Sequence, residues 1–133
     1  MNPPVHTLFA ILFTVLVTTS PAAANDPALG LWRTEPDRKK LISHINIREC
    51  GDKLCGKVIR AFDSNGKEVK TKHVGKELFW GIEPVGNGEY KNGTVYVPLL
   101  NVKAKASMQL RGSTLHVTGC KGGICDGQVW SRL

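Results

Sequence analysis

Short runs of alternating or β-branched residues, separated by glycine-rich steps, follow one another along most of the chain. Residues 41–49 show the pattern best, because Ile45 and Ile47 fall on one face of an extended strand and His44 and Asn46 on the other. The same reading predicts strands over residues 30–34, 41–49, 54–62, 77–85, 94–97, 102–110, 114–119 and 128–133. No stretch shows a helical period with caps at its ends.

Asn-Gly steps, the strongest short hairpin cue, occur at Asn65-Gly66, Asn87-Gly88 and Asn92-Gly93. About eight short strands at this spacing are typical of an up-and-down barrel or a sandwich. We favour a small eight-stranded antiparallel barrel, since a closed ring leaves no sheet edge to protect and its interior is filled by side chains or holds one small ligand. The polar residues 63–76 are expected to form the longest loop.

The uncharged apolar run Thr7–Thr19 precedes Pro21 and the small residues Ala22-Ala23-Ala24. It is shorter than the roughly 20 residues that span a bilayer and is typical of a secretory signal peptide. We therefore predict a signal peptide over residues 1–24, cleaved after Ala24, and one domain over residues 25–133. A retained N-terminal anchor is the alternative, because residues 1–6 contain no Lys or Arg. No later segment approaches the length of a transmembrane helix.

Cysteines occur as two copies of C-x4-C, at Cys50 and Cys55 and at Cys120 and Cys125. Export to the periplasm or beyond would place them in an oxidising compartment, where such cysteines usually form disulfides. The simplest connectivity pairs Cys50 with Cys55 and Cys120 with Cys125, each across a turn. A zinc site made of all four thiolates is the alternative, although zinc ribbons favour C-x2-C spacing.

The formal net charge is +7, and the predicted leader holds no Lys, Arg, Asp or Glu. A basic surface attracts anions, so lipid headgroups, lipopolysaccharide phosphates and acidic polysaccharides are candidate partners, with plain solubility as the alternative meaning. Export argues against nucleic acid as a partner.

No catalytic motif of the hydrolase, metalloprotease, P-loop or dinucleotide-binding type is present. His44, His73 and His116 lie far apart, and Asp63–Glu68 lacks the ligand spacing of a calcium loop. Glu83 and Glu89 flank a turn, where carboxylates are usually solvated. We therefore expect neither an enzyme nor a cofactor nor a metal site.

The first predicted strand carries Gly30-x-Trp32 and the last carries Trp130-x-Arg132. This pairing resembles the lipocalin/calycin arrangement, which implies that the Trp closes one end of the barrel and that the basic residue of the final strand packs across its indole. Stacking of Arg on Trp would add cation–π attraction and would bury the arginine stem.

More of the chain is similar to DUF2147, a bacterial family of unknown function. The similarity is carried by Gly30-Leu31-Trp32, Ile47-x-x-Cys50, Leu54–Ile59, Val74-Gly75, Gly81, Asn92–Tyr96 with Pro98, Leu115–Cys120 and Trp130–Arg132. It implies a small exported lipocalin-like barrel without an established activity. Leu99–Lys103 stands where many relatives have Gly-x-x-Tyr, so a ligand contact through that Tyr is not expected here.

We expect a binding module that holds an apolar or amphipathic, anionic small ligand at the open mouth of the barrel. The alternative is a filled, structural barrel whose outer face binds an envelope component or a protein. A hydrolytic enzyme is the least expected reading, since it would need a polar cluster around His44 or His116. Phe79 and Trp80 are adjacent, so one should face the interior and the other solvent or a loop. The candidate ligand contacts are Phe79, Trp80, Tyr96, Lys72, Lys76, Lys103 and Lys105.

Overall fold

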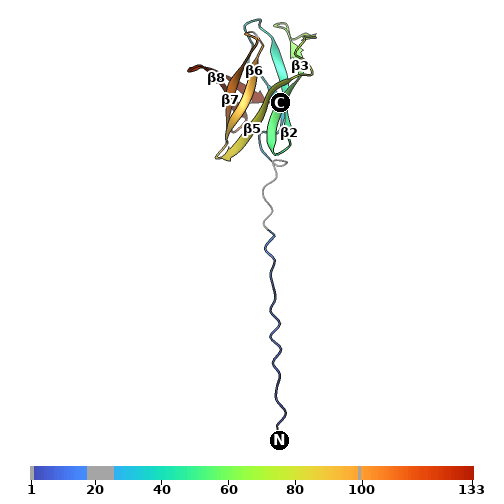
Figure 1. Cartoon of the computed structure of the whole chain (residues 1–133). Helices are drawn as coiled ribbons and strands as arrows, with labels where there is room; N and C mark the ends of the chain where they lie inside the picture. Colours follow the sequence, from blue (N-terminus) through green and yellow to red (C-terminus); the bar gives the residue numbers. More distant parts are fainter. Residues whose placement is uncertain (1, 18–25, 99) are drawn as a thin grey trace.

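A computed structural model describes residues 2–17, 26–98 and 100–133. The predicted cleavage site after Ala24 lies outside these residues. Residues 2–17 form no regular secondary structure, and they extend away from the barrel with their apolar side chains exposed (Figure 1).

Nine strands make up the described part of the domain: β1 (Gly30–Arg33), β2 (Ile42–Cys50), β3 (Lys53–Phe62), β4 (Glu68–Val69), β5 (Glu77–Gly86), β6 (Glu89–Val97), β7 (Val102–Arg111), β8 (Thr114–Lys121) and β9 (Ile124–Arg132). They pair in the order β2-β1-β9-β8-β7-β6-β5-β3-β4, and β2 also pairs with β3. That last pairing closes the ring, so the fold is an eight-stranded antiparallel barrel, with β4 as an appendage of β3. The all-β barrel predicted from the sequence is confirmed.

Two strands begin four or more residues before their predicted starts. The strand expected at 94–97 begins at Glu89, because Asn92-Gly93 forms a bulge within β6 and not a hairpin turn. Asn92 takes φ 63°, the register shifts between Tyr90 and Gly93, and Gly93 packs against Ile82, where a Cβ would come within 2.9 Å of the isoleucine Cβ. The strand expected at 128–133 begins at Ile124, directly after the tight turn Gly122-Gly123.

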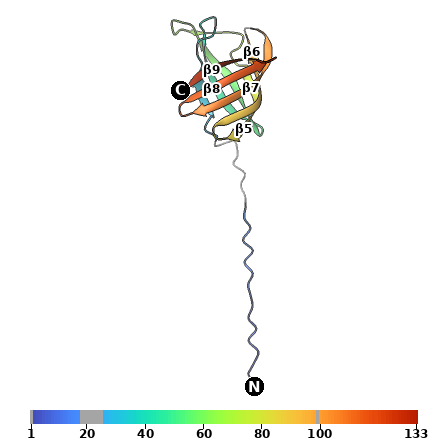
Figure 2. The ribbon, with the colours of Figure 1, turned by 90° about the vertical axis from the view of Figure 1, so that its left-hand side faces the viewer.

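The antiparallel order assigns the connections to two ends of the barrel. The plug end holds residues 26–29 and the β2–β3, β5–β6 and β7–β8 hairpins, whereas the rim end holds loops 34–41 and 63–76, the β6–β7 turn and the β8–β9 hairpin (Figures 1 and 2). The short strand β4 interrupts the loop that the sequence predicts over 63–76.

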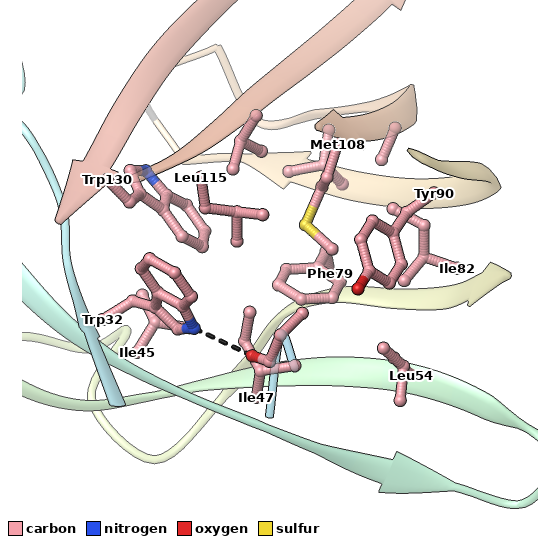
Figure 3. Close-up of a cluster of buried hydrophobic side chains, with 14 of the residues drawn as sticks. Trp32, Ile45, Ile47, Leu54, Phe79, Ile82, Tyr90, Met108, Leu115 and Trp130 are labelled. Atoms are coloured by element: carbon pink, nitrogen blue, oxygen red, sulfur yellow. Dashed lines mark hydrogen bonds between the residues drawn. The ribbon is translucent and has the colours of Figure 1, made fainter. Parts of the chain in front are cut away.

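Buried side chains from every strand of the ring fill the interior (Figure 3). Trp32, Phe79 and Leu115 are fully buried, and the Phe79 ring lies 6.2 Å from that of Trp130. Ile45 and Ile47 point inward as the alternation predicts. The interior therefore holds a packed hydrophobic core.

The plug end is closed by the chain that leads into β1. The Trp32 indole N–H donates to the carbonyl of the buried Ala28 at 2.8 Å, and the Tyr90 hydroxyl donates to the Asp26 carboxylate at 2.6 Å. These bonds tie residues 26–28 across the end of the barrel, so that the core is covered on this side.

The closure between β1 and β9 is short. Only Trp32 with Arg132 and Arg33 with Ser131 are paired among the described residues of these strands. Beyond them, the carboxylate of Glu35 accepts the Val129 N–H at 3.0 Å in place of a neighbouring strand. A side chain thus satisfies part of the β9 edge that β1 is too short to cover.

Candidate ligand-binding surface

Strands β5 to β8 lie side by side on the side of the barrel that Figure 2 shows. The outer face of these strands carries Trp80, Lys103 and Lys105. The strand register fixes this row, because Trp80 pairs with Thr94, Thr94 with Lys105, and Lys105 with Cys120. Their neighbours Phe79, Val95 and Ala104 are buried, so the row faces outward by simple alternation.

A hollow of about 460 Å³ lies over this row. It is lined by Thr94, Lys103, Ala104, Lys105, Cys120, Lys121, Gly122 and Gly123. One of its sides is the β8–β9 hairpin, where Gly122 and Gly123 take φ 58° and 80° and the Cys120–Cys125 disulfide joins the two strands. Only Ala104 belongs to the buried core, so the hollow lies outside the barrel interior.

Trp80 borders the lysines of the hollow. The ammonium of Lys103 lies 5.6 Å from the centroid of the Trp80 ring, within the range of cation–π attraction. No ion pair of the described residues involves Lys103, Lys105 or Lys121. The hollow is thus lined by lysines without ion pairs among the described residues, and the half-buried Trp80 ring lies beside one of them.

Tyr96 lies on β6 two residues after Thr94, and it pairs with Lys103 of β7. Its hydroxyl donates to the Asn101 side chain at 2.7 Å, and its ring centroid is 6.1 Å from that of His73. Burial, followed by the neighbouring Lys72 and Lys76, lowers the pKa of His73. Tyr96 is therefore engaged by the loop before β5 and does not line the hollow.

The structure separates the predicted ligand contacts into four groups, of which Tyr96 is one. Lys103 and Lys105 line the hollow with Trp80 beside Lys103, whereas Lys72 and Lys76 are exposed on loop 63–76. Phe79 lies apart from both sets, because its side chain is fully buried and packs in the core. The hollow differs in position from the expected site at the barrel mouth, because the core occupies the interior and the hollow lies on the outer face.

Sequence reasoning missed Thr94 and Lys121. The signal for Thr94 was available in the hairpins: the β7–β8 turn after Arg111 sets Lys105 opposite Cys120, and the β6–β7 turn sets Thr94 opposite Lys105. Counting back from the β6–β7 turn would have placed Thr94 beside Lys105, whereas Lys121 follows Cys120 at the β8–β9 hairpin and has no partner on β7 to count from.

The residues of the G-x-W resemblance meet at the plug end. The Arg132 guanidinium lies 4.0 Å from the centroid of the Trp32 ring and donates to the carbonyls of Leu29, at 2.6 Å, and Pro27. Gly30 has φ 110°, and a Cβ there would come within 3.3 Å of Arg132 Nη1. Trp130 is buried further inside, with its indole N–H bonded to Gln128 at 2.9 Å.

Both C-x4-C segments form the predicted local disulfides, Cys50–Cys55 at the plug end and Cys120–Cys125 at the rim end. Each closes a hairpin, and the alternative of a shared zinc site does not apply because the two pairs lie at opposite ends of the barrel. Two disulfides fit an oxidising, extracytoplasmic compartment.

A second hollow, of about 330 Å³, lies on the outer face of β1–β3 and is lined by Arg33, Ile42, His44, Phe62, Asp63, Ser64 and Gly66. The rings of His44 and Phe62 lie 4.6 Å apart. Burial, then the charges of Arg33 and Arg60, lowers the pKa of His44. The Asp63 carboxylate accepts the N–H groups of Asn65 and Lys67 and so belongs to a turn, not to a calcium loop.

The carboxylates Glu83 and Glu89, considered above as an acid/base pair, do not come together. Glu83 pairs with Lys53 at 3.2 Å and Glu89 with Lys91 at 3.7 Å, so the two carboxylates serve separate surface pairs. The part of the chain that the structure describes contains no group of three or more His, Cys, Asp or Glu residues placed to hold a metal ion. Within the same residues, no helix has the length and apolar character needed to cross a bilayer.

Residues 30–132 match the family described as "Uncharacterized protein conserved in bacteria (DUF2147)". The chain belongs to this family. The match covers the whole barrel, from the first residue of β1 to the last of β9.

Among solved structures, this DUF2147 protein is similar to protein HP1028 from Helicobacter pylori, whose description places it in the lipocalin family. The TM-score is 0.63 at 19% sequence identity, over 79% of this chain and 82% of that chain. At this identity the similarity shows a lipocalin-like fold, which is compatible with the binding of a small ligand. No curated protein matches the sequence.

Proposed function

We propose that this DUF2147 protein is an exported binding module for a small anionic, amphipathic molecule, held in the hollow on the outer face of β6–β8. The observation that carries the proposal is the group Lys103, Lys105 and Lys121 around a hollow of about 460 Å³, with the Trp80 ring beside Lys103. The unpaired ammonium groups would bind the anionic part of the ligand, and Trp80 would contact its apolar part.

The packed interior supports an outer site over an inner one. A ligand inside the barrel would have to displace core side chains such as Phe79 and Leu115, which are fully buried. Cores of this kind are packed to the density of organic crystals, so creating a ligand-sized hollow there is costly. Fatty acids and phosphate-bearing fragments of envelope lipids or lipopolysaccharide have the chemistry that the outer hollow would accept.

The same packed interior also favours the second candidate, a structural barrel that binds an envelope component or a protein through its outer face. The two candidates differ in what binds: a small anion alone, or only a macromolecule. Binding is proposed over catalysis because the lysines of the hollow have no carboxylate, histidine or thiol beside them among its lining residues.

Calorimetric titration with hexyl phosphate and with inorganic phosphate tests the proposal. We expect both to bind and hexyl phosphate to bind more tightly. The double variant Lys103→Gln/Lys105→Gln should weaken both by roughly five- to twentyfold, since exposed charge pairs contribute up to about 1 kcal/mol each.

Lys53→Gln/Lys91→Gln is the matched control, because it removes the same charge at the plug end. Trp80→Ala should weaken hexyl phosphate more than inorganic phosphate. Absence of binding by either compound, or equal weakening in the control, would reject the small-anion site and leave the macromolecular candidate.

A further inference from the structure

The two ends of the barrel differ in how their charges are satisfied. At the plug end, Lys53 and Lys91 form ion pairs with Glu83 and Glu89. At the rim end, loops 34–41 and 63–76 carry Lys39, Lys40, Lys67, Lys70, Lys72 and Lys76, and none of these takes part in an ion pair of the described residues.

Acidic side chains on the same two loops are held by the protein itself. The carboxylate of Asp37 accepts the N–H groups of Lys39 and Leu41, and that of Glu35 accepts the Val129 N–H. Glu68 lies 3.8 Å from Arg60. The lysines of the two loops are exposed and unpaired among the described residues, whereas these exposed acids are bonded or paired within the protein, so the rim end presents positive charge.

Two apolar side chains are exposed on other connections of the same end of the barrel. Ile124, at the tip of the β8–β9 hairpin, is 77% exposed, and Leu100, in the neighbouring β6–β7 turn, is 62% exposed. In Figure 1 the hairpin projects sideways from the part of the barrel that is away from residues 2–17, and Lys121 pairs with Ile124 across it. Exposed apolar tips flanked by lysines are the arrangement with which peripheral proteins bind anionic membranes.

We propose that the rim end docks on the surface of an anionic lipid bilayer, with Leu100 and Ile124 entering the headgroup region and the lysines of loops 34–41 and 63–76 contacting lipid phosphates. Charge complementarity favours this occupant over a protein partner, because the exposed cations are spread over two loops and do not converge on one pocket. The docking surface lies at the end away from the plug and does not require the hollow to be occupied.

The test is co-sedimentation with phosphatidylcholine vesicles made with and without phosphatidylglycerol. The protein is purified after expression of the full sequence, and mass spectrometry establishes that wild type and variants share one N-terminus. We expect binding that requires phosphatidylglycerol and is lost at high salt, when Coulomb attraction is screened.

Leu100→Ser/Ile124→Ser and Lys70→Gln/Lys72→Gln should each lower the bound fraction at least roughly fivefold. Val85→Ser is the matched apolar control, since Val85 is 47% exposed on the β5–β6 hairpin of the plug end. Lys91→Gln is the matched charge control.

Binding that is equal without phosphatidylglycerol, that persists at high salt, or that falls equally in Val85→Ser and Lys91→Gln would overturn the docking surface. Absence of binding would overturn it too. The salt dependence of binding by the wild type tests the docking surface even where a variant folds poorly.

Discussion

The guanidinium of Arg132 lies 4.0 Å from the centroid of the Trp32 ring and joins the last residue of β9 to the first strand of the barrel. The same guanidinium donates to the carbonyls of Pro27 and Leu29. One side chain thus fixes the segment that covers the plug end, and it does so beside the short β1–β9 closure.

Arg132→Ala should lower the free energy of unfolding by about 1–2 kcal/mol, because it removes the cation–π contact and leaves two carbonyls without their donor. Urea denaturation followed by tryptophan fluorescence measures the change. Arg111→Ala is the control, since Arg111 is an exposed residue bonded only to Gln109. Equal losses in the two variants would show that Arg132 does not fasten the plug.

Gly56 is required by the Phe79 ring, which lies directly against the glycine on the neighbouring strand. A Cβ at position 56 would overlap that ring, and the ring is fully buried and has no room to move. Gly56→Ala should therefore destabilise the fold by about 1–3 kcal/mol. Adding Phe79→Leu should make the double variant more stable than the sum of the two losses, and strict additivity would contradict the overlap.

The buried hydroxyl of Tyr90 should make the stability of the protein decline at alkaline pH. Burial, then the hydrogen bond to Asp26, raises the pKa of this hydroxyl well above the usual value of about 10. The folded state therefore holds this proton more tightly than the unfolded state, so the stabilisation is complete below about pH 10 and declines as the pH rises further.

Urea denaturation at pH 8 and pH 11 checks the effect of Tyr90. The wild type should lose more stability between these pH values than Tyr90→Phe, which has no proton to lose. Tyr96→Phe is the control, because the Tyr96 hydroxyl bonds to Asn101 on an exposed turn. If Tyr90→Phe and the wild type lose the same amount, the buried hydroxyl does not carry the effect.

The two disulfides should have separable roles. Cys120→Ser/Cys125→Ser opens the hairpin that forms one side of the hollow, so it should both destabilise the protein by about 2 kcal/mol and weaken hexyl phosphate binding. Cys50→Ser/Cys55→Ser should cost a similar stability at the plug end and leave binding unchanged. Denaturation and calorimetry on both variants decide this, and equal effects on binding would contradict the position of the site.

The closed barrel could be predicted because the information is local. Alternation places Ile45 and Ile47 inward, and Gly122-Gly123 between paired cysteines marks a hairpin. The Asn92-Gly93 bulge could not be read in the same way, since Asn-Gly takes positive φ in a turn and in a bulge alike. Its outcome depends on the packing of Gly93 against Ile82, a contact between two strands.

The candidate site was only partly predictable, for the same reason. Adjacency on a strand shows that Phe79 and Trp80 point to opposite faces, but only the packing against Gly56 and Trp130 decides that Phe79 is the inner one. Composition likewise cannot tell a filled barrel from a hollow one. The space left in the interior depends on how the side chains of Trp32, Phe79 and Trp130 pack. Strand register and bulges determine that packing.

The central claim is that a ligand binds outside a filled barrel, and the three tryptophans of the chain report on it separately. The Trp32 indole N–H is bonded to Ala28 in the plug, that of Trp130 to Gln128 beside the core, and Trp80 lies on the outer face next to Lys103. Titration of the ¹⁵N-labelled protein with hexyl phosphate should shift the indole resonance of Trp80 and leave those of Trp32 and Trp130 in place. Shifts of Trp32 and Trp130 without Trp80 would show that the ligand enters the interior and would contradict the account.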